Sequence, residues 1–474
     1  MSMQPEKLSF WLAEALEHDA PEPVSLQESI SADVCIVGGG FTGLWSAIEI
    51  KRRDPATHVA IVERGLCGSG ASGRNGGFVL SLWAKFLSLQ KLCGTDEAVR
   101  LAKASAEAVQ SIGDFCLANG IDADYRMSGW LWSASSAVQI GTWTETITAI
   151  ESRGCRPFEH HDSDEIAAMS GSPRHLAGVV EPVAACVQPA KLALGLRKVA
   201  LGMGVKIFEY TPMVQLKRDA RPGVVCAQGT VTADRVIIAL NAWGVMLKEI
   251  RKAIAVVSSD VVVTPPVPEA LSRCGWRNSF AISDSRMLVQ YYRTTRDDRI
   301  VFGKGGGTLA FGGAVGPAFD GPSPIAATVE RHLHATYPDV AGISVDQSWT
   351  GPIDRSKHGL PIFGQLANSP QILYGVGYSG NGVGPSVLGG RILASLALGT
   401  KDEWSGAGLV KPLKRAFPPE PFRYAGGKVV RAAVASRDRA DDAGRKAGVV
   451  VRTLASLAPS GLSPVRNDPP ARVP

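Results

Sequence analysis

Residues 38–43 read Gly38-Gly39-Gly40-Phe41-Thr42-Gly43 and join two apolar segments of different kinds. Residues 33–37 before them are typical of a buried strand, and residues 44–50 after them are typical of a helix. The spacing G-x-G-x-x-G supplies glycines where the chain turns tightly, where the backbone approaches a pyrophosphate, and where helix and strand pack closely. The segment therefore predicts a dinucleotide-binding turn, with NAD and FAD both open as the cofactor.

An acidic residue follows this turn at a suitable distance. The second predicted strand, residues 58–63, ends on Glu63, about 20 residues beyond the glycines. A carboxylate at that place can accept hydrogen bonds from both hydroxyls of an adenosine ribose. We therefore expect Glu63 to bind the cofactor, and we include its neighbour Arg64 in the predicted site.

The composition is that of a globular protein and argues against several functions. Charged residues make up 20% and hydrophobic residues 45% of the 474 residues. The net charge of +6 is dispersed, so nucleic-acid binding is not expected. No segment reaches the roughly 20 consecutive apolar residues of a membrane span. The eight cysteines form no C-x-x-C pair, which favours reduced thiols in a cytoplasmic protein.

One short sequence, His160-His161-Asp162, suggests a metal site. Adjacent histidines point apart, however, and no further cluster of ligands stands nearby in the sequence. We therefore predict no metal.

Two further glycine-rich segments carry a resemblance to a known family. Ala71-Ser72-Gly73-Arg74-Asn75-Gly76-Gly77 exposes backbone N–H groups that suit pyrophosphate oxygens and the polar edge of a flavin. Residues 377–386 form a loop between a strand and a helix, whose amides would stabilise an anionic reduced flavin. In this order the segments resemble the FAD-dependent amine oxidoreductases of the D-amino-acid oxidase superfamily, nearest the γ-glutamylputrescine oxidase branch. The resemblance covers about residues 32 to 400.

The resemblance implies a mixed α/β (α+β) fold, in which a Rossmann-like FAD-binding domain is interleaved with an antiparallel β-sheet substrate domain. The segments expected in the FAD-binding domain are residues 32–100, 177–250 and 340–400. Those expected in the substrate domain are residues 101–176 and 251–339. The remaining segments are an N-terminal arm (1–31) and a C-terminal linker, helix and tail (401–474), with a proline-rich linker at 412–423, a charged helix at 427–457 and expected disorder at 460–474.

FAD is expected to be bound without a covalent link, because no cysteine follows Cys274 in the region where the family forms one. The resemblance implies that the backbone at Met213-Val214 brackets the adenine, although an ordinary turn with a core valine is the alternative. It also places a turn after the predicted strand 235–240 near the pyrophosphate. The expected cofactor-binding residues are Gly38, Gly40, Phe41, Thr42, Gly43, Glu63, Arg64, Ser72, Gly73, Arg74, Asn75, Gly76, Gly77, Val214, Ala239, Asn241, Gly377, Tyr378, Gly380, Asn381 and Gly382.

The predicted substrate sheet contains Gln290-Tyr291-Tyr292-Arg293, which is expected to present polar side chains to a substrate. Successive strand residues point to opposite faces, so one tyrosine must face inward. A role for these aromatic residues in the core is the alternative. The residues predicted to contact substrate are Tyr291, Tyr292, Arg293, Lys304, Asp354 and Arg355.

The substrate class follows from a departure from the family pattern. Glycine and sarcosine oxidases clamp an α-carboxylate with an arginine, and Ile353 or Asp354 occupies that position here. A plain α-amino acid is thus a poor candidate. We expect an aminoalkyl compound with a distal carboxylate or phosphonate, its anion held by Arg293, Lys304 or Arg355 and its ammonium group attracted by Asp354.

The expected reaction is oxidation of a primary or secondary amine by hydride transfer from the α-carbon to flavin N5. The resulting imine hydrolyses to an aldehyde or ketone plus an amine. Val301 occupies the place of the lysine that helps oxygen react in sarcosine oxidase, so oxygen and another electron acceptor are both open. A flavin-dependent amine dehydrogenase and a non-catalytic flavin-binding or interaction protein are the alternatives, and the oligomeric state is open.

Overall fold

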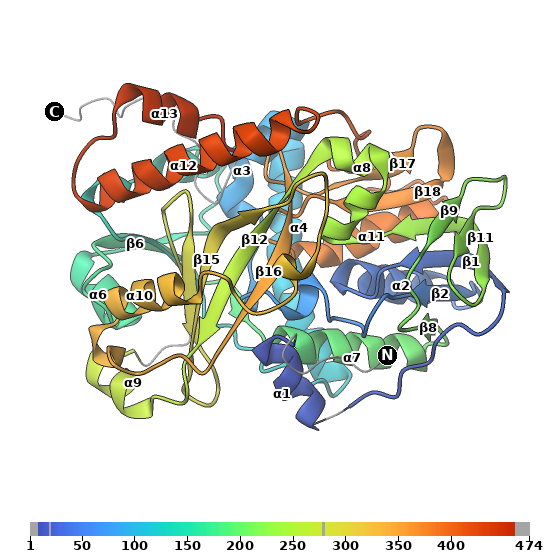
Figure 1. The fold of residues 1–474 in the computed structure, drawn as a ribbon, viewed down its shortest axis with the longest axis horizontal. Coiled ribbons are helices and arrows are strands. Elements are labelled where there is room, and N and C mark those ends of the chain that lie inside the picture. The colour runs from blue at the N-terminus through green and yellow to red at the C-terminus, as the bar shows by residue number, and fades with distance from the viewer. Residues whose placement is uncertain (1–7, 19, 277–279, 460–474) are drawn as a thin grey trace.

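Two large β-sheets lie side by side in the computed structural model, which describes residues 8–18, 20–276 and 280–459 (Figure 1). Helices cover both sheets, and the sheets contain parallel as well as antiparallel pairs of strands. The predicted mixed α/β class is therefore confirmed.

The first sheet has the order β17-β18-β11-β1-β2-β8, with β9 and β10 attached at β11. Its strands are β1 (Ile30–Val37), β2 (Val59–Val62), β8 (Lys206–Phe208), β9 (Gln215–Lys217), β10 (Gly223–Val225), β11 (Thr230–Ile238), β17 (Ile362–Leu366) and β18 (Ser369–Val376). The pairs that join β18, β11, β1, β2 and β8 are parallel. Residues 35–37 of β1 are buried, as expected for a parallel strand covered on both faces.

The predicted strand–turn–helix–strand unit at the start of the chain is confirmed. Helix α2 (Phe41–Arg53) begins inside the glycine turn and packs against α7 (Pro189–Gly202) and α11 (Pro385–Leu398). Strands β10 and β11 form an antiparallel hairpin. The predicted strand at 235–240 is wrong in its bounds, because it belongs to β11, which runs unbroken from Thr230 to Ile238.

The second sheet has the order β16-β12-β15-β14-β13-β4-β6-β5. Its strands are β4 (Trp130–Ala134), β5 (Glu159–His161), β6 (Ala177–Glu181), β12 (Ile254–Val263), β13 (Ala281–Asp284), β14 (Gln290–Thr294), β15 (Ile300–Leu309) and β16 (Gln347–Ser356). All pairs are antiparallel except β13–β4, so the predicted antiparallel sheet includes one parallel pair. A further, two-stranded sheet pairs β3 (Phe78–Val79) with β7 (Ala185–Cys186).

Two strands of this second sheet come from segments that we assigned to the FAD-binding domain. β6 pairs with β4, and β16 pairs with β12 along its whole length, from Gln347 opposite Val263 to Ser356 opposite Ile254. The chain then enters the first sheet at β17. The segment 347–356 therefore crosses between the sheets just before it reaches the third glycine loop.

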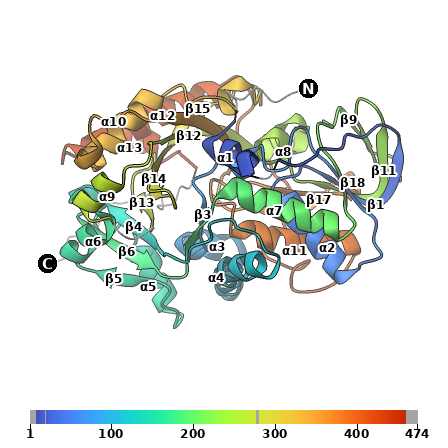
Figure 2. The ribbon, with the colours of Figure 1, turned by 90° about the horizontal axis from the view of Figure 1, so that it is seen from below.

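Helices complete the outer layers. Those not yet given are α1 (Phe10–His18), α3 (Phe86–Cys93), α4 (Thr95–Ala118), α5 (Thr144–Glu151), α6 (Ser163–Ser170), α8 (Lys248–Ala253), α9 (Pro268–Cys274), α10 (Ala326–Thr336), α12 (Phe422–Asp442) and α13 (Val449–Ala455). Helix α10 packs on β12 and β15, and α12 packs on β15. Figure 2 shows α10 and α12 on the side of the molecule away from α3 and α4.

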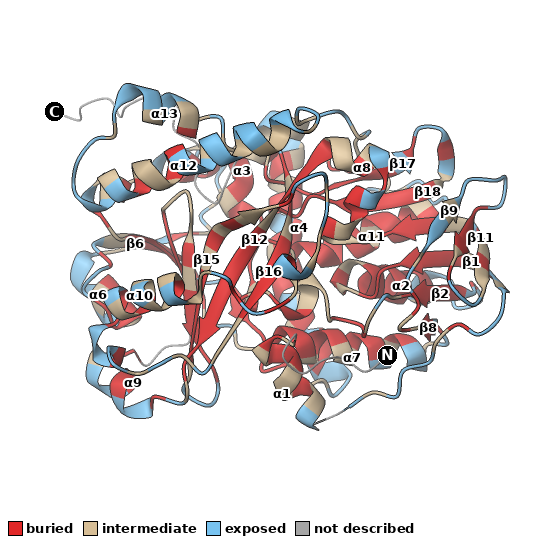
Figure 3. Ribbon diagram, in the orientation of Figure 1, coloured by how far each residue is buried: buried red, intermediate tan, exposed pale blue. Residues whose placement is uncertain are grey.

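The C-terminal region differs from its prediction. The expected single helix at 427–457 is two helices, because Gly444 takes φ of +66° between α12 and α13. Helix α12 also begins within the expected proline-rich linker. Figure 3 shows α12 exposed on its outer side over a buried sheet. The expected disorder at 460–474 lies outside the described residues, and across the described ranges no helix is long and apolar enough to span a membrane.

Candidate cofactor and substrate site

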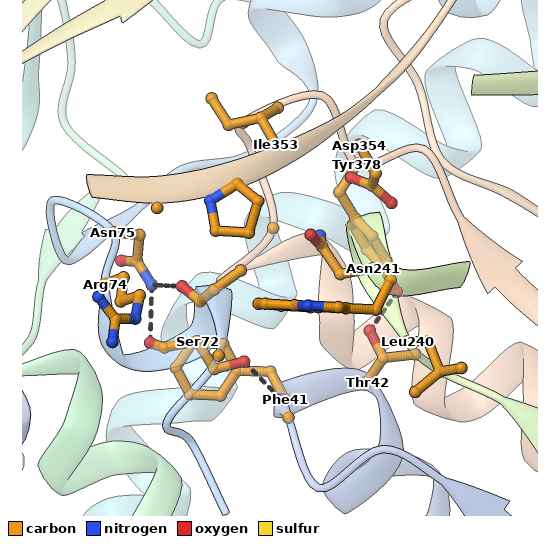
Figure 4. A pocket seen from close by; sticks show the side chains of 18 of the residues that line it. Phe41, Thr42, Ser72, Arg74, Asn75, Leu240, Asn241, Ile353, Asp354 and Tyr378 are labelled. Atoms are coloured by element: carbon orange, nitrogen blue, oxygen red, sulfur yellow. Dashed lines mark hydrogen bonds between the residues drawn. The ribbon is translucent and has the colours of Figure 1, made fainter. Parts of the chain in front are cut away.

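A cavity of about 450 Å³ lies where the two sheets meet. Its wall combines the three glycine-rich loops with residues of β12, β14 and β16. Figure 4 shows residues of the three loops together with Ile353 and Asp354 of β16. The structure thus brings together segments that are far apart in the sequence. The predicted site residues that line it are Gly38, Gly40, Phe41, Thr42, Glu63, Arg64, Ser72, Arg74, Asn75, Gly76, Ala239, Asn241, Tyr291, Asp354, Arg355, Tyr378, Gly380, Asn381 and Gly382.

The first glycine turn brings backbone to the cavity with no room for side chains. Gly38 has φ of +114°, and a Cβ there would lie 2.4 Å from the carbonyl oxygen of Ala239. A Cβ on Gly43 would lie 2.0 Å from the carbonyl oxygen of Gly38, so Gly43 shapes the turn from behind the cavity lining. Helix α2 starts at Phe41 with no side-chain cap at Gly40. Its N-terminus therefore faces the cavity as a site for an anion such as a pyrophosphate.

Glu63 closes one end of the cavity. Its Oε2 accepts a hydrogen bond from the Gly39 amide and its Oε1 accepts one from the Gly65 amide, both at 2.8 Å. Burial raises the pKa of Glu63. Each carboxylate oxygen still has a free lone pair, so both can accept hydrogen bonds from ribose hydroxyls. This geometry fits the predicted role.

An aromatic residue that the sequence interpretation missed lies at the same cavity. The guanidinium carbon of Arg64 is 4.6 Å from the ring centroid of Trp243, and an Arg64 nitrogen is 3.6 Å from a carboxylate oxygen of Asp320. Trp243 Nε1 is buried and, among the described residues, has no hydrogen-bond partner. An unpartnered donor in the wall of a cavity fits a ligand that carries acceptors.

The second glycine-rich loop is fastened by its own side chains. Asn75 Nδ2 donates to the carbonyl oxygens of Ala71 and Ser72, at 3.1 and 2.8 Å, while its Oδ1 accepts from the Gly77 amide at 2.8 Å. Ser72 Oγ accepts from the Phe41 amide at 2.9 Å, which ties this loop to the start of α2. The side chains of Ser72 and Asn75 thus hold the loop so that its backbone faces the cavity.

Arg74, Gly73 and Gly77 hold the shape of this loop. Arg74 donates to the carbonyl oxygen of Thr350 at 3.1 Å, across to β16. Gly73 and Gly77 lie behind the lining, where a Cβ would be 2.5 Å from the Gly68 carbonyl oxygen and 2.2 Å from that of Val187, respectively.

Asp354 joins β16 to the third glycine loop. It is 0% exposed, and its Oδ2 accepts from the Gly377 amide at 2.5 Å, whereas its Oδ1 is buried and has no partner among the described residues. Burial raises the pKa of Asp354 to about 7. Gly377 itself, with φ of +88°, lies outside the lining. Figure 4 shows Asp354 and Tyr378 on the opposite side of the cavity from Arg74 and Asn75.

The predicted tyrosine pair divides as the strand period requires. Tyr291 lines the cavity, and its hydroxyl is 2.8 Å from Ser259 Oγ. Tyr292 points to the other face, where its ring stacks on Phe302 at 4.7 Å and its hydroxyl is 3.0 Å from His175 Nε2. The prediction that Tyr292 contacts substrate is therefore wrong, because it lies in the core behind the sheet.

The predictions that Arg293 and Lys304 contact substrate are also wrong, because neither residue lines the cavity. Arg293 is 0% exposed and donates to the carbonyl oxygens of Gly76 and Val187, at 2.8 and 2.6 Å, so it supports the second glycine-rich loop from outside the cavity. Lys304 does not line the cavity, and its Nζ is 3.5 Å from the carbonyl oxygen of Leu288. Burial lowers the pKa of Lys304.

Val214 is the fourth correction, because the residue is 65% exposed and lies outside the cavity lining. Its neighbours Pro212 and Met213 line the cavity instead.

Several lining residues had no signal in the sequence. They are Trp243, Ser259, Ser283, Met287 and Val289. The last two belong to the loop between β13 and β14, because β14 begins at Gln290.

Comparisons with known proteins agree with this geometry. A family model described as FAD dependent oxidoreductase matches residues 33–396. The gamma-glutamylputrescine oxidoreductase of Escherichia coli (strain K12) is 30% identical over 411 residues, which cover 86% of this chain and 91% of that protein. The glycine oxidase of Geobacillus kaustophilus (strain HTA426) is 26% identical over 378 residues, covering 77% of this chain and 92% of that protein.

The fold is shared as well. The crystal structure of glycine oxidase from Geobacillus kaustophilus aligns with a TM-score of 0.64 at 22% identity, covering 82% of this chain and all 100% of that chain. The matched family model spans most of the sequence, including all three glycine-rich loops. The chain therefore belongs to the family of FAD-dependent oxidoreductases, and FAD is its cofactor.

Proposed function

We propose that this FAD-dependent oxidoreductase oxidises a primary or secondary amine that carries a carboxylate or phosphonate at a distance from the nitrogen. Bound FAD supplies a hydride acceptor at its N5 atom. The amine loses a hydride from its α-carbon and a proton from its nitrogen. Water hydrolyses the imine to an aldehyde or ketone, with release of ammonia from a primary amine or of the smaller amine from a secondary one. The chain's own residues hold the cofactor and aim the substrate.

Three backbone segments support the proposal that this cavity binds FAD. The α2 N-terminus suits the pyrophosphate and the Glu63 carboxylate suits the ribose, as argued above. The loops at 72–76 and 378–382 present small residues and backbone amides from two sides of the cavity. We propose that Gly43, Gly73, Gly77 and Gly377 act indirectly, by shaping these segments.

The observation that carries the substrate proposal is the pair Asp354 and Arg355 at the same cavity. The unpartnered Oδ1 of Asp354 can accept a hydrogen bond from a substrate ammonium group. Arg355 can pair with an anionic group elsewhere on the same molecule. An acid and a cation at adjacent positions favour a substrate that carries both charges.

A second cation near Arg355 strengthens this argument. Lys85 is 4% exposed, and burial followed by the positive charge of Arg355 lowers the pKa of Lys85 to about 7. An anion bound at Arg355 would offset this repulsion and favour the charged form of Lys85. With Arg293 and Lys304 outside the cavity lining, we assign the distal anion to Arg355. Lys85 also lies outside the lining, so it can act only through its interaction with Arg355.

The name of the relative from Escherichia coli is consistent with this class, because γ-glutamylputrescine has a free amine and a carboxylate at opposite ends. It is therefore the first compound to test. Aminoalkylphosphonates extend the series, and putrescine is a matched amine without an anion.

The electron acceptor has two candidates, oxygen and another acceptor. Val301 is 1% exposed and packs in an apolar cluster with Trp11 and Trp349, away from the cavity lining. A hydrophobic side chain there offers no charge to assist oxygen. This observation favours an amine dehydrogenase as the second candidate function. Oxygen consumption measured against reduction of a dye distinguishes an oxidase from a dehydrogenase.

The substrate proposal is tested by the concentration dependence of anaerobic flavin reduction, with γ-glutamylputrescine and with putrescine. We expect Arg355→Met to weaken the apparent affinity for γ-glutamylputrescine by about tenfold, the scale of one charge-assisted hydrogen bond, and to change that for putrescine little. The control Lys401→Met removes an exposed cation from the protein surface. Equal effects of Arg355→Met on both amines would refute the assignment.

A further inference from the structure

Helix α12 contacts the substrate side of the cavity wall, although it lies beyond the residues that the family model matches. It runs across the second sheet, at the top of the view in Figure 1. The wall below it includes Met287 and Val289, from the loop between β13 and β14, and Gly305 of β15. The position of α12 therefore bears on the shape of the cavity.

Asp438 of α12 binds the backbone of this loop. Its two carboxylate oxygens accept hydrogen bonds from the amides of Met287 and Leu288, at 3.3 and 3.1 Å. Asp438 is 8% exposed, so these are shielded, charge-assisted bonds. Met287 faces the cavity while its own amide is held from outside.

A hydrogen bond and two ion pairs hold the same loop in place. Asp284 Oδ1 accepts from the Gln290 amide at 2.9 Å, which closes the loop on itself. Arg286 binds Asp284 on one side and donates to Asp442 Oδ1 of α12 at 2.6 Å on the other. The loop is thereby held between β13 and α12.

A second contact joins α12 to the consecutive glycines of β15, residues 305–307. Arg431 Nε donates to the carbonyl oxygen of Gly306 at 2.5 Å, next to Gly305 in the cavity wall. Ala433 and Val434 pack against Met287 and Leu288. The contacts of α12 thus reach two segments that form the same wall.

We infer that α12 fixes the substrate wall, and that Asp438 is a positioning residue that sets substrate affinity through the loop 285–289 without touching substrate. The inference deepens the proposed function and rests on it for the identity of this wall as the substrate side. It assigns to the C-terminal region a part in forming the site.

The test compares Asp438→Ala, Asp438→Asn and the control Asp441→Ala in the FAD-loaded protein. Asp441 lies on the same helix, and its carboxylate is 3.8 Å from Arg437. Hydrogen exchange of the peptide covering residues 284–290 reports on the loop. Anaerobic flavin reduction by γ-glutamylputrescine or, if that is not oxidised, by the fastest amine of the same series reports on affinity and on the limiting rate separately.

We expect Asp438→Ala to speed exchange of the Met287 and Leu288 amides by about tenfold or more and to weaken apparent amine affinity by a similar factor, the scale of lost charge-assisted bonds. The limiting rate and FAD content should stay within about twofold, because Asp438 does not line the cavity. Asp438→Asn keeps one acceptor oxygen and should restore part of both properties, while Asp441→Ala should match the parent protein.

Unchanged loop exchange in Asp438→Ala would overturn the inference, as would faster exchange with unchanged affinity. Failure of every amine to reduce the flavin would instead count against the proposed function. Loop exchange would still decide whether α12 holds the wall, because that measurement needs no turnover.

Discussion

Thr42 Oγ1 donates a hydrogen bond of 2.8 Å to the hydroxyl oxygen of Tyr378, across 336 positions of the sequence. Thr42 lies in the first turn of α2, directly after the opening glycines, and Tyr378 lies in the third glycine loop. Both residues line the cavity. One hydrogen bond therefore connects the first glycine turn to the third glycine loop at the proposed FAD site.

Tyr378→Phe removes this bond and leaves the Thr42 hydroxyl without its acceptor. A buried hydrogen bond contributes about 1 kcal/mol, so we expect the Kd for FAD to rise about fivefold. Fluorescence titration of the apoprotein with FAD measures it. Thr42→Val should raise the Kd for FAD by a similar factor, and the double variant should raise it no more than either single variant. Additive effects on the Kd would show that the two residues act separately.

Gly38→Ala should abolish FAD binding. A Cβ there would lie 2.4 Å from the Ala239 carbonyl oxygen, and φ is +114°. Gly120→Ala is the matched control, because Gly120 also has positive φ, at +63°, but nothing lies within 4 Å of its added Cβ. Both variants should lose about 1 kcal/mol of stability from backbone strain. Only Gly38→Ala should purify without flavin. Retained flavin in that variant would contradict a close approach of the Gly38 backbone to the cofactor.

Asp354 should make the stability of the apoprotein depend on pH. Its pKa in the folded protein is about 7, above the ordinary value of 3.8, so folding favours the protonated carboxyl. The stabilisation is complete below about pH 4 and is lost as pH rises through about 7, by at most about 4 kcal/mol. Thermal unfolding of parent and Asp354→Asn apoproteins from pH 5 to pH 8 measures it. The parent Tm should fall relative to that of the variant, and parallel curves would contradict the raised pKa.

FAD should leave the protein on acid precipitation. Among the described residues no cysteine lines the cavity, although a Cβ on Gly39 would lie 2.5 Å from Cys67 Sγ. Absorbance of the supernatant and of the redissolved pellet gives the distribution of flavin. Cys67→Ser serves as the control for the nearest thiol at the first glycine turn. Flavin in the parent pellet that disappears from the Cys67→Ser pellet would establish a covalent link and refute this prediction.

The sequence located the glycine-rich loops that line the cavity, because their signals are local. The spacing of Gly38 to Gly43 reflects backbone geometry within one turn, and Glu63 follows from the length of one βαβ unit. The loop at 71–77 was also identifiable, because consecutive small residues leave backbone groups exposed. Each signal lies within a few residues of the atoms that it positions.

The cavity wall formed by the second sheet was predicted poorly, because it depends on contacts between distant segments. Alternation along β14 required one tyrosine to face inward but could not show which one, since that depends on pairing with β15. Arg293 carries the positive charge expected of an anion-binding residue. Its guanidinium instead donates hydrogen bonds to the carbonyl oxygens of Gly76 and Val187. The contact between Asp438 and the Met287 amide joins positions about 150 residues apart, and no local pattern marks it.

Anaerobic mixing of the purified yellow protein with γ-glutamylputrescine and its aminoalkylphosphonate analogues tests the central claim most directly. We predict that at least one amine with a distal anion bleaches the flavin, forms one carbonyl product per flavin reduced, and does so at lower concentrations than putrescine or glycine. If no compound of the series bleaches the flavin, or if glycine is the better substrate, oxidation of an amine with a distal anion is contradicted.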